Sequence, residues 1–139
     1  MRLIILALLL PVFAAAQSKG DTKITATPSD TAHLFSKLVT LLYTEDYIVK
    51  VEDSTHGVIV TEPKMLKQYL NPTLRLKLTV RANTVTITGE FNSNLKTAYG
   101  SESTYEPVIN RGMKGSVYRV SWDEMDRIAK IIGATSYGK

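Results

Sequence analysis

The sequence contains no cysteine, and this single absence excludes several kinds of chemistry. Disulfide bonds, thiolate catalysis and cysteine-ligated zinc or iron–sulfur centres all need that side chain. The chain must therefore fold around its hydrophobic core without covalent cross-links. Its 139 residues are enough for that, because a domain of this size buries most of the surface of its unfolded chain.

Motifs typical of enzymes and metal sites are scarce. The two histidines, His33 and His56, form no H-x-x-x-H pair, and no G-x-S-x-G elbow is present. The glycine-containing segment 111–116 lacks the spacing of a phosphate-binding P-loop, so a glycine-permitted turn is the simpler interpretation. We expect neither a catalytic site, nor a metal site, nor a cofactor.

Long hydrophobic runs are missing except at the start of the chain. Arg2 is followed by 14 uncharged, mostly apolar residues, Leu3 to Ala16, ending in three alanines. This run is shorter than the roughly 18 residues that span a bilayer, and its order of charge, apolar core and small residues is typical of a cleavable signal peptide. We predict a signal peptide over residues 1–16 and no permanent membrane anchor.

An exported domain without disulfides favours a bacterial protein, located in the periplasm or secreted. Gln17 stands where a bacterial lipoprotein would carry its lipid-bearing cysteine, so lipid attachment there is excluded. The net charge of +4 is a weak excess, and nucleic-acid-binding domains concentrate far more positive charge on one face. We therefore expect no nucleic-acid partner.

The mature chain reads as a polar, flexible tail (17–23) followed by one domain (24–139). Thr27, Pro28 and Asp30 resemble a helix start, and leucines at helical spacing predict a helix over 28–43. Alternating residues predict strands at 47–52, 58–61, 74–81 and 84–91. Ser121 and Glu124 fit a capping box for a last helix, which Gly133 ends.

This order predicts an α+β fold: a four-stranded antiparallel sheet with two helices packed on one face. Leu74, Leu76 and Leu78 would face the helices, whereas Arg75 and Lys77 would face solvent.

Three stretches carry a resemblance: YTEDYIVKVEDSTHGVIVTEP (43–63), RLKLTVRANTVTITGEF (75–91) and GSVYRVSWDEMDRIAKIIG (115–133). In this α-β-β-β-β-α order, behind a signal peptide, the chain resembles small exported bacterial domains of unknown function with a TATA-binding-protein-like (TBP-like) fold. The resemblance covers roughly residues 25–135. It implies that fold, and it carries no catalytic residues.

Acidic residues are absent between Lys64 and Arg81, where five basic residues occur. Three of them alternate with core leucines on one strand: Arg75, Lys77 and Arg81. Two interpretations remain open: a solvated strand face that deters edge-to-edge pairing, or a docking face for an anionic protein, peptide or polysaccharide.

The polar segment 92–116 is the second candidate for function, because long loops in compact domains are often functional. It contains Tyr99, Tyr105 and Arg111. We expect a non-enzymatic binding module that uses the basic face or this loop. The alternative is an enzyme or an enzyme inhibitor that acts through the loop.

Overall fold

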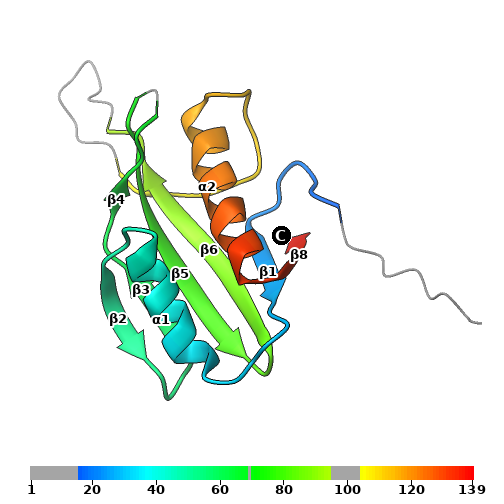
Figure 1. The fold of residues 1–139 in the computed structure, drawn as a ribbon. Coiled ribbons are helices and arrows are strands. Elements are labelled where there is room, and N and C mark those ends of the chain that lie inside the picture. Colours follow the sequence, from blue (N-terminus) through cyan, green and yellow to red (C-terminus); the bar gives the residue numbers. More distant parts are fainter. Residues whose placement is uncertain (1–15, 69, 95–103) are drawn as a thin grey trace, which may run out of the picture.

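The computed structural model describes residues 16–68, 70–94 and 104–139, and it shows two helices packed on one face of an antiparallel sheet (Figure 1). The sheet order is β2-β3-β5-β6-β1-β8, while β4 pairs with β5 and β7 pairs with β6. The α+β class and the two helices are confirmed, but the expected four strands are wrong, since the sheet has eight. The elements are β1 (Lys23–Thr27), α1 (Leu34–Thr44), β2 (Val49–Asp53), β3 (Val58–Thr61), β4 (Lys64–Met65), β5 (Thr73–Arg81), β6 (Thr84–Asn92), β7 (Glu106–Pro107), α2 (Val117–Ile132) and β8 (Ala134–Gly138).

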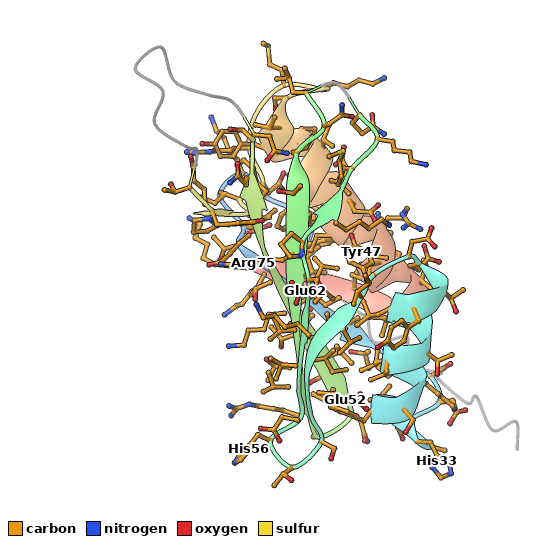
Figure 2. All side chains as sticks on the ribbon, turned by 90° about the vertical axis from the view of Figure 1, so that its left-hand side faces the viewer. His33, Tyr47, Glu52, His56, Glu62 and Arg75 are labelled. Atoms are coloured by element: carbon orange, nitrogen blue, oxygen red, sulfur yellow. The ribbon has the colours of Figure 1, made fainter. Side chains whose placement is uncertain are left out.

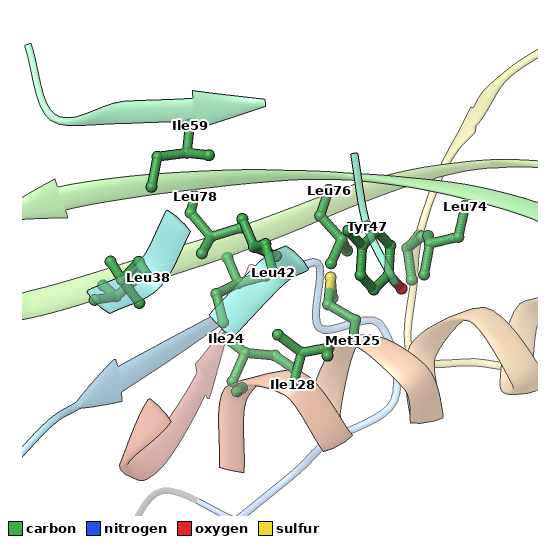
Figure 3. Packing of buried hydrophobic residues seen from close by; sticks show 14 of the residues in the cluster. Ile24, Leu38, Leu42, Tyr47, Ile59, Leu74, Leu76, Leu78, Met125 and Ile128 are labelled. Carbon is green, nitrogen blue, oxygen red and sulfur yellow. The ribbon is translucent and has the colours of Figure 1, made fainter. Parts of the chain in front are cut away.

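The long hairpin of β5 and β6 is the centre of the sheet and follows the sequence pattern. Its tight turn places Ala82 at a φ of 51°, and the pairing runs without a break from Arg81↔Thr84 to Thr73↔Asn92. Leu74, Leu76 and Leu78 are buried beneath the helices, as their alternation predicts. Figure 3 shows these leucines in contact range of residues from α1 and α2.

Strands β1 and β8 were not expected, and they extend the sheet beyond β6. Strand β1 pairs with β6 and with β8, so residues from the two ends of the domain lie side by side (Figure 1). The K-I-T-A-T stretch of β1 alternates polar and apolar residues, with Ile24 and Ala26 buried. That alternation was the available signal, but five residues are too few to outweigh the helix-start pattern beside them.

The predicted start of the first helix at Pro28 is wrong, because the residue before it takes part in the sheet instead. Thr27 completes β1 by pairing with Ala134, and α1 begins only at Leu34. His33 precedes it in the left-handed region, at a φ of 52°. Sheet pairing across the domain therefore outweighs the local propensity of Thr27 and Pro28 for a helix start.

The segment 17–23, which we expected to be a flexible tail, makes hydrogen bonds with the rest of the domain in the structure. Residues 18–21 form a turn in which the Asp21 N–H donates to the Ser18 carbonyl at 3.2 Å. The carboxylate of Asp21 is buried and accepts from the backbone N–H and the hydroxyl of Ser18. Lys23 already belongs to β1.

Helix α2 begins five residues earlier than predicted. Its N-cap is Ser116, whose side chain accepts from the Arg119 N–H at 3.3 Å. Ser121 is fully buried inside the helix, so the predicted capping box with Glu124 is wrong. The buried stripe of the helix holds Trp122, Met125, Ile128 and Ala129. Gly133 ends the helix, and a Cβ there would lie 2.3 Å from the carbonyl oxygen of Thr27.

Among the helices that the structure describes, none has the length and apolar character to cross a membrane.

Candidate functional site

A groove of about 570 Å³ crosses the face of the sheet that the helices leave open. Figure 2 shows the sheet nearly edge-on, with Arg75 on the side opposite α1. Strand pairing places Val51 beside Val60, Val60 beside Lys77, and Lys77 beside Thr88. Directly paired residues share a face of the sheet, so these four side chains form one row across β2, β3, β5 and β6. The other lining residues are Thr22, Lys50, Thr61, Glu62, Pro63, Arg75, Leu76, Gly89, Glu90, Pro107 and Val108.

A β-bulge in β2 gives the groove its apolar end. The pairing shifts between Val49 and Val51, so the two valines do not share a face as strict alternation would require. Val49 packs against the core, whereas Val51 is 42% exposed on the open face beside Val60. Pro63 and Pro107 add further apolar surface. The bulge thus turns a core valine position into a contact surface.

Arg75 is held in place within the groove by two partners. Its guanidinium pairs with the carboxylate of Glu90 at 2.5 Å and lies over the ring of Tyr105, 4.2 Å from the ring centre. Glu90 is the residue directly opposite on β6. Arg75 is therefore an ion-paired part of the wall rather than a free positive charge.

Two lysines of the groove have no such partner. Lys77 and Lys50 are exposed, and neither makes an ion pair or a side-chain hydrogen bond within the described ranges. Glu62, on the same wall, is likewise without an ion-pair partner in that part of the chain. The groove thus combines an apolar patch, two available cations and one available carboxylate.

The structure separates the binding residues expected from the sequence. Arg75 and Lys77 line the groove and Tyr105 braces it, but Arg81 lies at the far end of β5 and is not part of the lining. Arg111 lies in a different depression, beside the start of α2. Tyr99 lies outside the described residues.

Several groove residues were missed because their positions depend on pairing between strands. Val49 is partly buried and Val51 is exposed because of the bulge, which no local sequence pattern predicts. Pro107 reaches the groove because the two-residue strand β7 pairs with Glu90 and Phe91. A proline at a sheet edge was the one available signal, since proline is tolerated only there.

A second polar cluster lies on the helix side of the sheet, between α2 and the segment after α1. Tyr47 is buried and donates from its hydroxyl to Glu124 at 3.0 Å, and Arg127 donates to the same carboxylate at 2.8 and 3.0 Å. Arg127 also pairs with Glu45 at 2.7 Å. Lys64 lies over the Tyr47 ring and donates to the Glu45 carbonyl.

The electrostatics of this cluster indicate a structural role. Burial, followed by the nearby Glu124 carboxylate, raises the pKa of Tyr47, which keeps its phenol protonated. Burial alone would raise the pKa of Glu124, but the hydrogen bonds from Arg127 and Tyr47 outweigh it and lower that pKa. A carboxylate that is ionised near neutral pH and accepts from three donor groups fits a clamp between elements better than a group that exchanges protons there.

In the part of the chain that the structure describes, no group of three or more histidines and acids could hold a metal ion. His56 lies in the exposed β2–β3 turn, 2.8 Å from Asp53. His33 is exposed at the start of α1. Figure 2 shows the two histidines at the lower end of the molecule, on opposite sides of it.

No protein-family model matches this sequence, and no curated protein sequence matches it.

Proposed function

We propose that this protein is an exported, non-enzymatic binding domain whose open sheet face holds a partner in the groove. The observation that carries the proposal is the row Val51–Val60–Lys77–Thr88, which presents apolar surface and an unpaired cation side by side. The groove volume of about 570 Å³ lies within the range of ligand-binding clefts. Such a cleft suits a small segment of a partner rather than a large flat interface.

The chemistry of the groove favours a peptide segment that carries both an acidic and an apolar side chain. Lys50 and Lys77 would meet the acid, and Val51 and Val60 the apolar side chain. Glu62 would repel a uniformly anionic polysaccharide, but it can accept from a backbone N–H of a peptide. A protein or peptide partner is therefore the better fit of the anionic candidates.

Export of the domain and its relation to the exported TBP-like bacterial domains belong to the same proposal. The signal-like run at residues 1–16 supports export. The resemblance to the TBP-like domains is supported by the order of elements, because a helix, two hairpins and a final helix are all present within the larger sheet. A binding role outside the cytoplasm is consistent with both.

Selection of a random peptide library against the purified protein tests this function. We expect the enriched peptides to combine acidic and apolar residues, and we expect Lys77→Glu to weaken their binding at least tenfold in a fluorescence anisotropy titration. Lys77 is exposed, so its reversal should change the free energy of unfolding by no more than about 0.5 kcal/mol.

Lys37→Glu is the matched control, since it reverses one exposed charge on α1, on the other side of the sheet. Binding of the selected peptides should survive this change and should weaken as salt rises, because exposed charges are screened over roughly 8–10 Å. Equal loss in both variants, or selection of peptides with no acidic residue, would contradict the proposed function.

A further inference from the structure

A second depression, of about 590 Å³, lies between the N-terminal turn and the start of α2, and its ionisable lining is entirely basic. Its walls are Gln17, Lys19, Asn110, Arg111, Gly112, Met113 and Arg119. We propose that this basic basin binds a phosphate group, either free or carried as a monoester on a larger molecule. The proposal does not depend on the groove of the open sheet face, because the two sites share no residue.

Backbone hydrogen bonds hold the two loops that supply the cations against each other. The Asn110 N–H donates to the Asp21 carbonyl at 2.8 Å, and the Gly20 N–H donates to the Asn110 carbonyl at 2.9 Å. The Asn110 side-chain amide donates to the Ser18 carbonyl at 2.9 Å. The backbone at Lys19 is thereby held next to the loop of Arg111, and both residues line the same depression.

The position of Arg111 is further fixed by its own loop. Its guanidinium stacks on the ring of Tyr118, 3.9 Å from the ring centre. Gly112 follows at a φ of +89°, and a Cβ there would lie 2.3 Å from the Ser116 hydroxyl. Only glycine fits this close turn, which leads from Arg111 into the N-cap of α2. A stacked guanidinium with free N–H edges is a common way to recognise phosphate.

No acid is among the described residues that line the basin. Lys19 and Arg111 make no ion pair in the described part of the chain, and Arg119 has only Asp123, at 3.8 Å. Asp21, the nearest acid to Lys19 in sequence, is turned inward onto Ser18. Arg119 lies in the first turn of α2, which contains no acid, although the helix dipole disfavours a cation there.

Cations that line one depression repel one another unless an anion joins them, and of these three only Arg119 has an acidic partner in the described part of the chain, Asp123 at 3.8 Å. A phosphate monoester carries about 1.5 to 2 negative charges at neutral pH, whereas a carboxylate or a sulfate ester carries one. A phosphate group is therefore the anion that best balances the two unpaired cations, Lys19 and Arg111, and Arg119 lies beside them in the same lining. Arginine also meets phosphate oxygens with two parallel hydrogen bonds.

Titration of the ¹⁵N-labelled protein with inorganic phosphate, at constant ionic strength, tests the basin. We expect saturable changes in the amide signals of Lys19, Gly112 and Arg119. Arg111→Gln should weaken binding at least tenfold, whereas Lys37→Gln, which removes one exposed charge elsewhere, should leave it within about twofold. Phenyl phosphate in a parallel titration distinguishes the two sources: tighter binding than inorganic phosphate indicates an ester, and weaker binding indicates the free ion.

Two results would overturn the proposal. The first is a set of shifts that never saturates and spreads over all the basic residues, which indicates general attraction only. The second is equal affinity in the wild type and Arg111→Gln, with the spectrum of the variant showing an intact fold.

Discussion

At the residue scale, Gln17 joins the predicted processing site to the core of the domain. Its amide oxygen accepts from the indole N–H of the fully buried Trp122 at 3.3 Å. Its amide nitrogen donates to Asp126 at 3.2 Å and to the Tyr137 hydroxyl at 3.1 Å. One polar side chain from the N-terminal segment thus completes a hydrogen-bond network that links α2 to β8.

We expect Gln17→Ala to lower the free energy of unfolding by about 1–3 kcal/mol. The buried indole N–H would lose its acceptor, and an unsatisfied buried donor carries a cost of that order. Urea unfolding followed by the fluorescence of the single tryptophan measures the loss. Gln68→Ala, at an exposed loop position, is the control. An unchanged midpoint for Gln17→Ala would show that the indole does not depend on this bond.

At the element scale, the clamp of Glu124, Arg127 and Tyr47 ties α2 to the segment that follows α1. Its pH dependence follows from the lowered pKa of Glu124. A carboxyl whose pKa is lower in the folded state contributes stability above its unfolded value, and loses it as pH falls through the folded value. The ordinary pKa is 4.5, so the contribution should be complete near neutral pH and should fade below about pH 4.5.

Glu124→Gln isolates this contribution, because Asp30 and Asp53, whose pKa values are also lowered, remain in both proteins. We expect the variant to be less stable than the wild type at pH 7, with the difference shrinking as pH falls below about 4.5. Thermal melts of both proteins at several pH values provide the comparison. A stability difference that is constant across this range would contradict an ionised Glu124 clamp.

The elements that the sequence predicted are those in which local pattern and global packing agree. The alternation in β5 and β6 and the apolar stripe of α2 are strong, and the structure places both as expected. The errors cluster where distant pairing decides, at β1, at β8 and at the start of α1. Ser121 looked like a cap because a serine before an acidic turn suits that role, yet the helix extends back to Ser116.

In the candidate site too, the sequence predicts what local pattern decides and misses what distant contacts decide. The positive charges of Arg75 and Lys77 could be placed on the open face from alternation alone. Alternation could not predict that Arg75 is ion-paired while Lys77 makes no ion pair among the described residues. The partners of Arg75 are Glu90, which strand pairing places opposite it, and Tyr105, which a loop brings near it. The contribution of Val51 depends on a bulge, and the basic basin depends on contacts between residues about 90 positions apart.

At the scale of the whole molecule, the proposed export leads to a prediction about the N-terminus. We expect the exported protein to begin at Gln17, after cleavage behind Ala16. Intact-mass measurement of the product, with and without signal-peptidase inhibition, checks this. Cyclisation of Gln17 would release its amide nitrogen as ammonia, and we expect it to be slow in the folded domain because that nitrogen is hydrogen-bonded. A dominant product that retains Met1 would contradict both the processing and the export.

We propose that the open sheet face is the binding face of the whole molecule, and mapping a selected acidic–apolar peptide by NMR tests this most directly. We expect the amide signals changed by the peptide to lie in one row across the sheet, at Val51, Val60, Lys77 and Thr88. We also expect the signals of α1, on the opposite face, to stay unchanged (Figure 2). Changes confined to the helices, with the row unaffected, would contradict the claim.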